Sequence, residues 1–369
     1  MQSQKIGIKK KFINDSIFKE YLCPNPFMYA ELQENGNVST CCYIHHQFGN
    51  TNKEELKEIW NNDDFKELRR SILDGDYSYC DGSKCASMQA VLENRKSINK
   101  YQVPYELILK SEIPDITEYE QVQKLPKIIS LDDDPTCNLS CPSCRKSLIV
   151  LTKEQSQNKL NKQIKFMEES VDSLEELWLC GAGDPFASDA YKKLLTTFDF
   201  SKIPQLKIRI DTNGILLNET MWNTTLKNVQ DKINIIAVSV DATNQNTYSI
   251  IRKGGNFNVL LRNLHFLSAL KREKKFIFLI RMIVQKDNFQ EMIDFVKLGQ
   301  ELNVDHVVFS EIQNWGTFSH NEYVEKAVHL ETNENFKVLC NILKNPIFTE
   351  SIVNLGNLTT LFHKVNNEK

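Results

Sequence analysis

From Lys127 onward, short apolar runs alternate with amphipathic stretches, and this alternation constrains the fold more than any other feature. Strands that alternate with helical patterns indicate βα units and a parallel sheet. The expected helices include residues 153–171, 259–274 and 290–302. The expected strands are Ile128–Asp132, Leu174–Cys180, Leu206–Asp211, Ile233–Val240, Phe276–Val284 and His306–Ser310. Six units are too few for a closed eight-stranded barrel, so we predict an α/β fold with a partial (βα)6 TIM-like barrel and a site at its C-terminal strand ends.

The first expected strand leads into a loop that holds three cysteines, Cys137, Cys141 and Cys144. The spacing C-x3-C-x2-C can bring three thiolates to three corners of a cubane cluster, and it supplies no ligand for the fourth corner. Because most iron–sulfur clusters take four cysteines, a compact group of three leaves one iron open. A zinc site would need a fourth ligand nearby. A cluster of core cysteines does not suit the flanking Asn, Ser, Pro and Arg residues, which are typical of a loop.

The cysteine loop and the segments that follow the later strands together resemble the motifs of the radical S-adenosylmethionine (SAM) enzymes. Ala182-Gly183-Asp184-Pro185 is similar to the Gly-Gly-Glu-Pro motif of that family, and Asp211-Thr-Asn213-Gly214 to its Thr-Asn-Gly turn. Ser239-Val-Asp241 resembles its Ser-x-Asp segment, and Tyr248–Phe257 a stretch of its maturases. The resemblance implies a 4Fe-4S cluster on Cys137, Cys141 and Cys144, with SAM on the open iron. It also implies contacts to SAM from Ala182, Gly183, Asp184, Asn213, Ser239, Asp241 and Arg252.

The chain departs from the family pattern at three of these positions. Ser143 stands where an aromatic residue often precedes the last cysteine, which puts one contact to the SAM adenine in doubt. Ala182 and Asp184 replace a glycine and a glutamate. These two changes are mild where the contacts come from main-chain atoms. Arg252 is expected to pair with the SAM carboxylate, since a guanidinium binds carboxylates bidentately. Arg281 either faces the barrel lumen or belongs to a structural ion pair.

The first quarter of the chain contains a second group of cysteines, at positions 23, 41, 42, 80 and 85. With the helical segment Leu56–Trp60 between them, they resemble the SPASM/twitch auxiliary-cluster modules of radical SAM enzymes. The resemblance implies one auxiliary 4Fe-4S cluster on Cys23, Cys41, Cys80 and Cys85, which is a full set of four ligands. Cys42 could replace Cys41, but the glycine at position 36 favours Cys41. A zinc site that includes His45 or His46 is the alternative.

Length and composition place these motifs in an ordinary globular chain of 369 residues, 41% hydrophobic and 25% charged. The expected domains are an auxiliary-cluster domain at 1–90, a connecting segment at 91–126, the partial barrel at 127–315 and a C-terminal helical extension at 316–369. A formal charge of −3 gives no indication of a nucleic-acid partner. No signal peptide or apolar stretch of membrane-spanning length is expected, so the cytoplasm is the expected compartment. Cys180 and Cys340 stand alone and are expected to be packing residues.

The expected function is that of a radical SAM enzyme. It would cleave SAM reductively to a 5′-deoxyadenosyl radical and abstract hydrogen from a substrate, with electrons from an external one-electron reductant such as flavodoxin or ferredoxin. A ribosomally made peptide is the favoured substrate, and a sugar or other small metabolite is the alternative. Glu311, Gln313 and Trp315 follow the last expected strand, where they would either face the substrate or form a packed loop. A hypothesis of another class is a non-catalytic protein that binds zinc or an iron–sulfur cluster.

Overall fold

The computed structural model describes residues 16–41, 44, 46–82, 85, 87–88, 91, 107–109, 122, 124–179 and 182–367. The chain divides into two compact units. The first consists of residues 1–133 and 165–177, and the second of residues 134–164 and 178–369. The boundary passes through helix α5 (Lys153–Glu169) and strand β6 (Glu176–Leu179). Most of the expected connecting segment, 91–126, lies outside the described residues.

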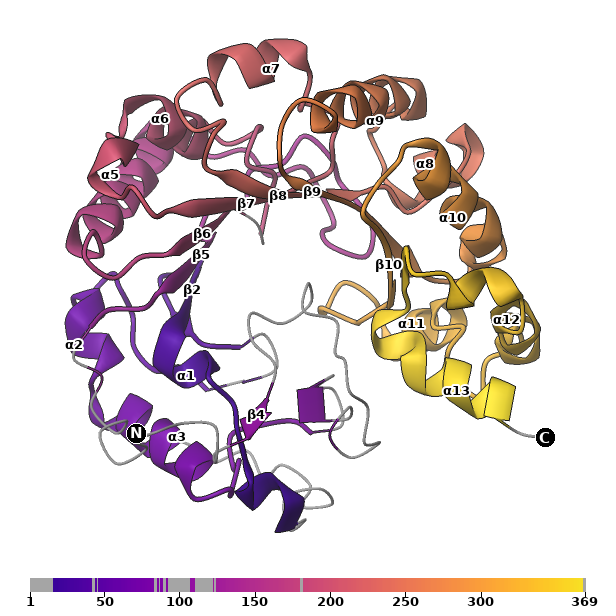
Figure 1. The fold of residues 1–369 in the computed structure, drawn as a ribbon, viewed down its shortest axis with the longest axis horizontal. Helices are drawn as coiled ribbons and strands as arrows, with labels where there is room; N and C mark the ends of the chain where they lie inside the picture. Colours follow the sequence, from indigo (N-terminus) through magenta and orange to yellow (C-terminus); the bar gives the residue numbers. More distant parts are fainter. Residues whose placement is uncertain are drawn as a thin grey trace. The chain divides into compact units, whose positions relative to one another are not determined.

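The described part of the first unit contains short strands and helices. The strands are β1 (Tyr21–Leu22), β2 (Tyr29–Gln33), β3 (Val38–Ser39), β4 (Ile108–Leu109) and β5 (Ile128–Asp132), and the helices include α1 (Asn25–Met28), α2 (Leu56–Trp60) and α3 (Asp63–Leu73). Strand β2 pairs in parallel with β5, Tyr29 opposite Ile128, and antiparallel with β3 (Figure 1). Strands β1 and β4 form a separate antiparallel pair. The first four residues of β5 are buried, which fits an apolar strand inside a sheet.

A buried arginine holds the helices of the first unit together. Asn62 caps α3 by accepting a hydrogen bond from the amide of Phe65 at 2.9 Å. One turn later, Arg69 is fully buried and donates to the carbonyl oxygens of Pro26 at 2.9 Å and Trp60 at 2.7 Å. Its guanidinium also lies 4.7 Å from the centroid of the Trp60 ring. Arg69 therefore ties α1, α2 and α3 to one another.

The second unit contains the run of parallel strands that the sequence predicts. The strands follow the order β11-β10-β9-β8-β7-β6, with β7 (Lys207–Thr212), β8 (Ile233–Ser239), β9 (Ile277–Val284), β10 (His306–Glu311) and β11 (Val353–Asn354). The helices are α6 (Asp189–Thr197), α7 (Glu219–Thr224), α8 (Gln245–Ile251), α9 (Phe257–Lys271), α10 (Met292–Glu301), α11 (His320–Lys326), α12 (Phe336–Leu343) and α13 (Thr359–Asn367). Figure 1 shows α6, α7, α9 and α10 on the outer face of strands β7–β10. This is the arrangement of a partial TIM-like barrel.

Packing between strands and outer helices explains why the strands read as continuous apolar runs. Strands covered on both faces exclude polar residues along most of their length. On β10, the ring of Phe309 lies 5.8 Å from that of Phe295 in α10 and 5.9 Å from that of Phe348 near the C-terminus. Helix α10 and the 3-10 helix Pro346–Thr349 thus both pack against β10 through Phe309.

The predicted α/β fold is confirmed, with strand ends shifted by one or two residues. The helices predicted at 153–171, 259–274 and 290–302 are α5, α9 and α10. The prediction missed β1, β2 and β3, because it found little strand periodicity before Glu54, and it missed the two-residue strands β4 and β11. Strand β2 escaped because its sequence, Tyr-Ala-Glu-Leu-Gln, lacks both a long apolar run and strict alternation. The parallel run therefore extends beyond six strands.

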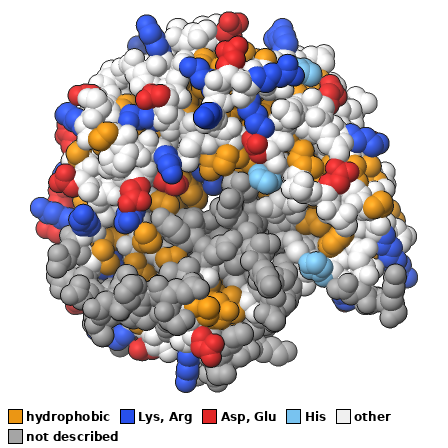
Figure 2. Space-filling view, viewed as in Figure 1, with side chains coloured by type: hydrophobic (Ala, Val, Ile, Leu, Met, Phe, Trp, Pro, Cys, Tyr) orange, Lys and Arg blue, Asp and Glu red, His pale blue; other side chains and the backbone are white. Residues whose placement is uncertain are grey.

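The surface supplies two further observations. On the face shown in Figure 2, the Lys and Arg side chains of the described residues are interspersed with Asp and Glu rather than gathered into a field of one sign. None of the helices that the structure describes combines the length and the apolarity needed to cross a bilayer.

Candidate functional site

The three-cysteine loop of the second unit is folded as a compact turn. The amides of Cys144 and Arg145 both donate to the carbonyl oxygen of Cys141, at 2.9 and 3.0 Å. Leu139 packs with Cys137 and Cys141 in a small buried cluster, so these two thiols face inward. Cys144 is exposed. The loop thus presents two buried sulfurs and one open to solvent.

Each of the three sulfur atoms receives a hydrogen bond from a side chain of the same unit. Asn213 Nδ2 lies 3.8 Å from Cys137 Sγ, and Arg252 Nη1 lies 3.8 Å from Cys141 Sγ. Arg145 Nη2 donates to Cys144 Sγ at 3.4 Å. N–H donors stabilise negative charge on sulfur and tune the potential of a bound cluster. Burial raises the pKa of the Cys137 and Cys141 thiols, and a bound cation would favour their thiolate forms. The donor set therefore fits an iron–sulfur cluster.

The turn after β6 packs directly against the strand exit that leads into the loop. A Cβ on Gly183 would lie 2.3 Å from the carbonyl oxygen of Thr136, so only glycine fits at this close approach. The amide of Asp184 donates to the same Thr136 oxygen at 2.9 Å. Ala182 accepts a hydrogen bond from Arg145 at its carbonyl oxygen. Cys180 and Gly181 lie outside the described residues.

The Asp184 carboxylate is buried and accepts several hydrogen bonds from its own protein. Its carboxylate accepts from Thr212 Oγ1 at 2.7 Å, from the Asn213 amide at 2.8 Å and from the Phe186 amide at 3.1 Å. Burial raises its pKa, while these donors act in the opposite direction. The side chain thereby fixes the turn after β7 to the turn after β6.

Asn213 bridges the end of β7 and the cysteine loop. Besides its bond to Cys137, its Nδ2 donates to Asn138 Oδ1 at 2.8 Å, and its Oδ1 accepts from the Ile215 amide at 3.0 Å. Gly214 follows with a positive φ of 78°, which makes the turn tight. The predicted Thr-Asn-Gly turn therefore lies against the first cysteine of the loop.

The segment after β8 brings Asp241 and Arg252 together. Asp241 has a left-handed backbone, with φ of 64°, and its Oδ1 accepts from the Ile283 amide at 2.7 Å. Its Oδ2 forms an ion pair with Arg252 Nη2 at 2.6 Å. Arg252 thus already has a carboxylate partner in addition to Cys141, while its Nε has no partner among the described residues. Ser239 is half-buried at the end of β8, opposite Arg281 of β9 in the strand register.

Arg281 forms an ion pair, one of the two alternatives considered from the sequence. Asp211 binds Arg281, and Arg209 Nε donates to the same carboxylate at 2.8 Å. Burial raises the pKa of Asp211, but the two guanidinium groups outweigh it and hold that pKa below its usual value. The guanidinium of Arg209 also lies 4.3 Å from the ring centroid of Trp178.

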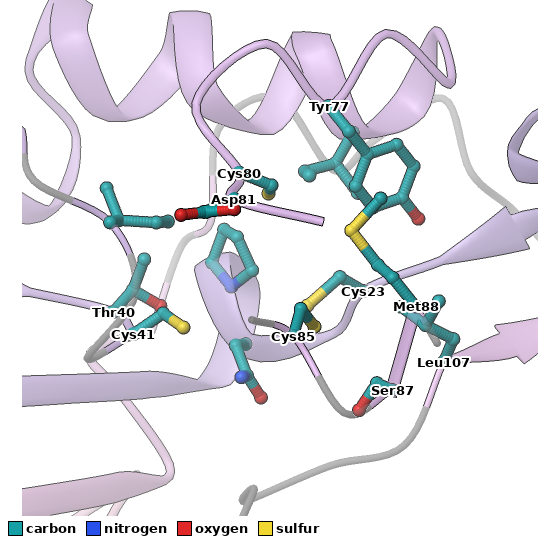
Figure 3. Close-up of a pocket in the computed structure, with 14 residues that line it drawn as sticks. Cys23, Thr40, Cys41, Tyr77, Cys80, Asp81, Cys85, Ser87, Met88 and Leu107 are labelled. Carbon is teal, nitrogen blue, oxygen red and sulfur yellow. The ribbon is translucent and has the colours of Figure 1, made fainter. Parts of the chain in front are cut away.

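Four cysteines of the first unit, far apart in sequence, line one pocket. Figure 3 shows Cys23, Cys41, Cys80 and Cys85 around this pocket. Burial and neighbouring thiols raise the pKa of Cys23 and Cys80, and burial first of all raises that of Cys85 to about 11. Across the described residues, no three His, Cys, Asp or Glu side chains form a group that fits a single metal ion.

Polar atoms at the same pocket lack partners. Asn25 Oδ1 and Thr40 Oγ1 are buried at its lining, and neither has a hydrogen-bond partner in the described part of the chain. Buried polar groups are normally satisfied, so unpaired ones mark a place for a bound group. Four cysteines around such a cavity match, in number and kind, the ligands that a saturated 4Fe-4S cluster requires.

Cys42, His45 and His46 are the alternative ligands considered for this pocket. Cys42 and His45 lie outside the described residues. His46 Nε2 lies 3.4 Å from Asp64 Oδ2, and its ring packs against Phe48 and Tyr79, at centroid distances of 4.8 and 5.3 Å. The imidazole of His46 is thus engaged with α3 and its aromatic neighbours.

Glu311 and Trp315, at and after the end of β10, lie in different environments. Glu311 accepts from Asn357 Nδ2 at 3.1 Å and lies 3.9 Å from His329 Nε2. Trp315 is 63% exposed. The loop that carries Trp315 reaches the cysteine loop, because Thr317 Oγ1 donates to the carbonyl oxygen of Ser143 at 3.2 Å. The lone Cys340 is half-buried in α12.

Sequence reasoning missed Arg145 as a site residue. Its side chain is buried and reaches Cys144, Pro135 and Ala182, which come from three different parts of the second unit. The available signal was a lone arginine directly after the third cysteine, in a loop otherwise built of small and polar residues.

Comparisons with known proteins agree with this division of the cysteines. Residues 23–86 match the SPASM family, described as an iron–sulfur cluster-binding domain, and residues 135–299 match the radical SAM superfamily. The GTP 3′,8-cyclase of Synechocystis sp. is 27% identical over 189 residues, which are 51% of this chain and 54% of that protein. The chain thus spans about half the length of this curated relative.

Two solved structures are also similar to the chain. Streptococcus suis SuiB bound to S-adenosylmethionine has a TM-score of 0.44 and 14% identity, covering 80% of this chain and 61% of that one. The protein anSMEcpe with bound AdoMet and Kp18Cys peptide has a TM-score of 0.40 and 15% identity, covering 66% of this chain and 67% of that one.

Proposed function

Because this chain belongs to the radical SAM enzymes that carry a SPASM iron–sulfur domain, we propose that it cleaves SAM reductively and abstracts hydrogen from a substrate. The observation that supports this most is the loop at Cys137, Cys141 and Cys144, in which every sulfur has an N–H donor. A separate set of four cysteines lines the pocket of the first unit, so the loop need not share its ligands.

In this proposal the loop cysteines hold three irons of a 4Fe-4S cluster and leave the fourth to SAM. A bound cluster, reduced by one electron, would supply the electron for cleavage of the C5′–S bond of SAM to methionine and a 5′-deoxyadenosyl radical. The main chain of Ala182 and Gly183 would bind the SAM amino group. Asn213, Ser239 and Asp241 would line the ribose side of the site, and Arg252 would approach the carboxylate.

Two of these residues act chiefly by positioning. Asp184 holds the turn after β7 in place through two hydrogen bonds, from Thr212 and from the Asn213 amide, and Asp241 holds Arg252 against Cys141. Arg252 already has a carboxylate partner, so an interaction with SAM would add to this ion pair or replace it. Cys23, Cys41, Cys80 and Cys85 would bind the auxiliary 4Fe-4S cluster. An external one-electron reductant, such as flavodoxin or ferredoxin, would supply the electron.

We propose that the substrate is a ribosomally made peptide, because enzymes with this pair of domains commonly modify such peptides. The match to a GTP 3′,8-cyclase favours a small metabolite as the second candidate. Deuterium transfer distinguishes the two. A deuterated peptide and a deuterated small metabolite are each incubated with the enzyme and SAM. Deuterium should appear in 5′-deoxyadenosine only with the class that is the substrate.

The activity is tested after anaerobic reconstitution with iron and sulfide. We expect about eight irons per chain, four in each of two 4Fe-4S clusters, and conversion of SAM to methionine and 5′-deoxyadenosine under reduction. Changing Cys137, Cys141 and Cys144 together to Ala should abolish SAM cleavage and leave about four irons in the SPASM domain. Undiminished cleavage by this variant would refute the assignment of the loop. Zinc in place of iron would favour the non-catalytic alternative.

A further inference from the structure

Arg145 connects the cysteine loop to the turn after β6. Its Nη1 donates to the carbonyl oxygen of Pro135 at 2.6 Å, while its Nη2 donates both to Cys144 Sγ, at 3.4 Å, and to the carbonyl oxygen of Ala182. One NH2 group therefore serves a sulfur and a carbonyl oxygen at the same time. The side chain is 9% exposed, so water competes little for these bonds.

The charge of Arg145 distinguishes it from the other guanidinium at the loop. Arg252 is paired with Asp241 at 2.6 Å, which offsets its charge beside Cys141. All acceptors of Arg145 are carbonyl oxygens or sulfur, and no carboxylate of the described residues forms an ion pair with it. Charged donors make hydrogen bonds about twice as strong as neutral ones. The field of Arg145 at Cys144 is therefore not offset by a carboxylate partner.

A positive charge next to a cluster ligand favours the reduced cluster, because reduction adds one negative charge. Hydrogen bonds to the sulfurs act in the same direction. The geometry points to Arg145 as the positioning residue that raises the reduction potential of the cluster on the loop and links that potential to SAM binding. This rests on the proposed function, in which the Ala182 main chain contacts the SAM amino group.

The link follows from the shared Nη2 group. A SAM ammonium at the Ala182 carbonyl oxygen would compete with Arg145 for that acceptor. Released from the Ala182 oxygen, the guanidinium would be able to move toward Cys144 and shorten the 3.4 Å hydrogen bond to its sulfur. Because coupling between two equilibria is reciprocal, SAM would raise the potential through Arg145, and reduction would tighten SAM binding.

The test is a redox titration of the reconstituted, full-length protein, followed by electron paramagnetic resonance with and without SAM. The signal that changes on addition of SAM belongs to the loop cluster, which separates it from the auxiliary cluster. For Arg145→Gln we expect a tenfold smaller equilibrium constant for reduction, equivalent to a potential about 59 mV more negative. Arg145→Lys should fall between this variant and the wild type, because the ammonium restores the charge without the planar fork.

Arg262→Gln is the matched control, since Arg262 is an exposed arginine on α9 of the same unit, and its potential should equal that of the wild type. SAM should raise the potential of the wild type more than that of Arg145→Gln. The inference is overturned if the loop cluster of Arg145→Gln has the same reduction potential as that of the wild type. If Arg145→Gln does not incorporate the loop cluster, the same comparison is made with Arg145→Lys. A wild-type protein without any SAM-responsive signal would instead overturn the proposed function.

Discussion

The close packing of Gly183 leads to a sharp prediction. The replacement Gly183→Ala places a Cβ 2.3 Å from the Thr136 carbonyl oxygen, 2.6 Å from the Asp134 carbonyl oxygen and 2.9 Å from the Pro135 carbonyl carbon. All three neighbours are backbone atoms, so no side chain can turn aside. The turn after β6 and the strand exit at 134–136 must separate by about 1 Å to reach ordinary carbon contacts.

The cost has two parts. Overpacking of a well-packed site costs about 1–3 kcal/mol. Separation also weakens the hydrogen bond from the Asp184 amide to Thr136, which spans 2.9 Å, and the loss of such a bond costs about 1 kcal/mol. We therefore expect Gly183→Ala to lower the free energy of unfolding by about 3 kcal/mol. Because the Ala182 carbonyl moves with the turn, SAM cleavage should fall about 100-fold, as for a 1 Å misplacement.

Urea unfolding of the anaerobically reconstituted protein, followed by far-UV circular dichroism, measures the first effect, and 5′-deoxyadenosine production measures the second. Gly316→Ala is the control. Gly316 has φ of +88° and no atom within 4 Å of a built Cβ, so this variant bears only a backbone cost of about 1 kcal/mol. The reasoning is refuted if Gly183→Ala unfolds within about 0.5 kcal/mol of the wild type, the range of neutral surface changes, and keeps its cleavage rate.

Two further predictions concern stability. Arg69→Met should lower the free energy of unfolding by about 3 kcal/mol, since buried acceptors lose charged hydrogen bonds; the exposed Arg70→Met serves as control, and equal urea midpoints would contradict this role. Burial raises the pKa of Glu311 to about 7 and lowers that of His329 to about 4. Stability contributed by Glu311 is lost as pH rises from 4.5 to 7, whereas stability contributed by His329 is gained from pH 4 to 6.5, so the two nearly cancel. Glu311→Gln leaves only the histidine, so its stability should rise by about 3 kcal/mol over that range, and an unchanged pH profile in urea titrations would count against it.

The elements that could be predicted from the sequence are those whose signal is local. Each strand of the barrel has its own apolar run, and the spacing of Cys137, Cys141 and Cys144 is contained in eight residues. Strand β2 is different, because its place beside β5 depends on pairing between residues about 100 positions apart, for example Tyr29 with Ile128. No short window of sequence contains that information.

In the candidate site too, some features could be predicted from the sequence and others depend on the fold. The grouping of Cys23, Cys41, Cys80 and Cys85 was expected, and the four do line one pocket, while their binding of a cluster stays a prediction. The sequence could not indicate which acceptors Arg145 reaches. Pro135 and Ala182 lie 10 and 37 positions away, and only the folded turn places both within hydrogen-bond distance.

Asp241 has a consequence for how this site can vary. Its left-handed backbone favours Gly, Asn or Asp, whereas its ion pair with Arg252 requires a carboxylate. Glutamate keeps the charge but is disfavoured by the backbone, and asparagine suits the backbone but lacks the charge. Aspartate alone meets both demands, so saturation mutagenesis should find this position intolerant of every substitution. No single substitution at Asp241 therefore keeps both the backbone conformation and the ion pair.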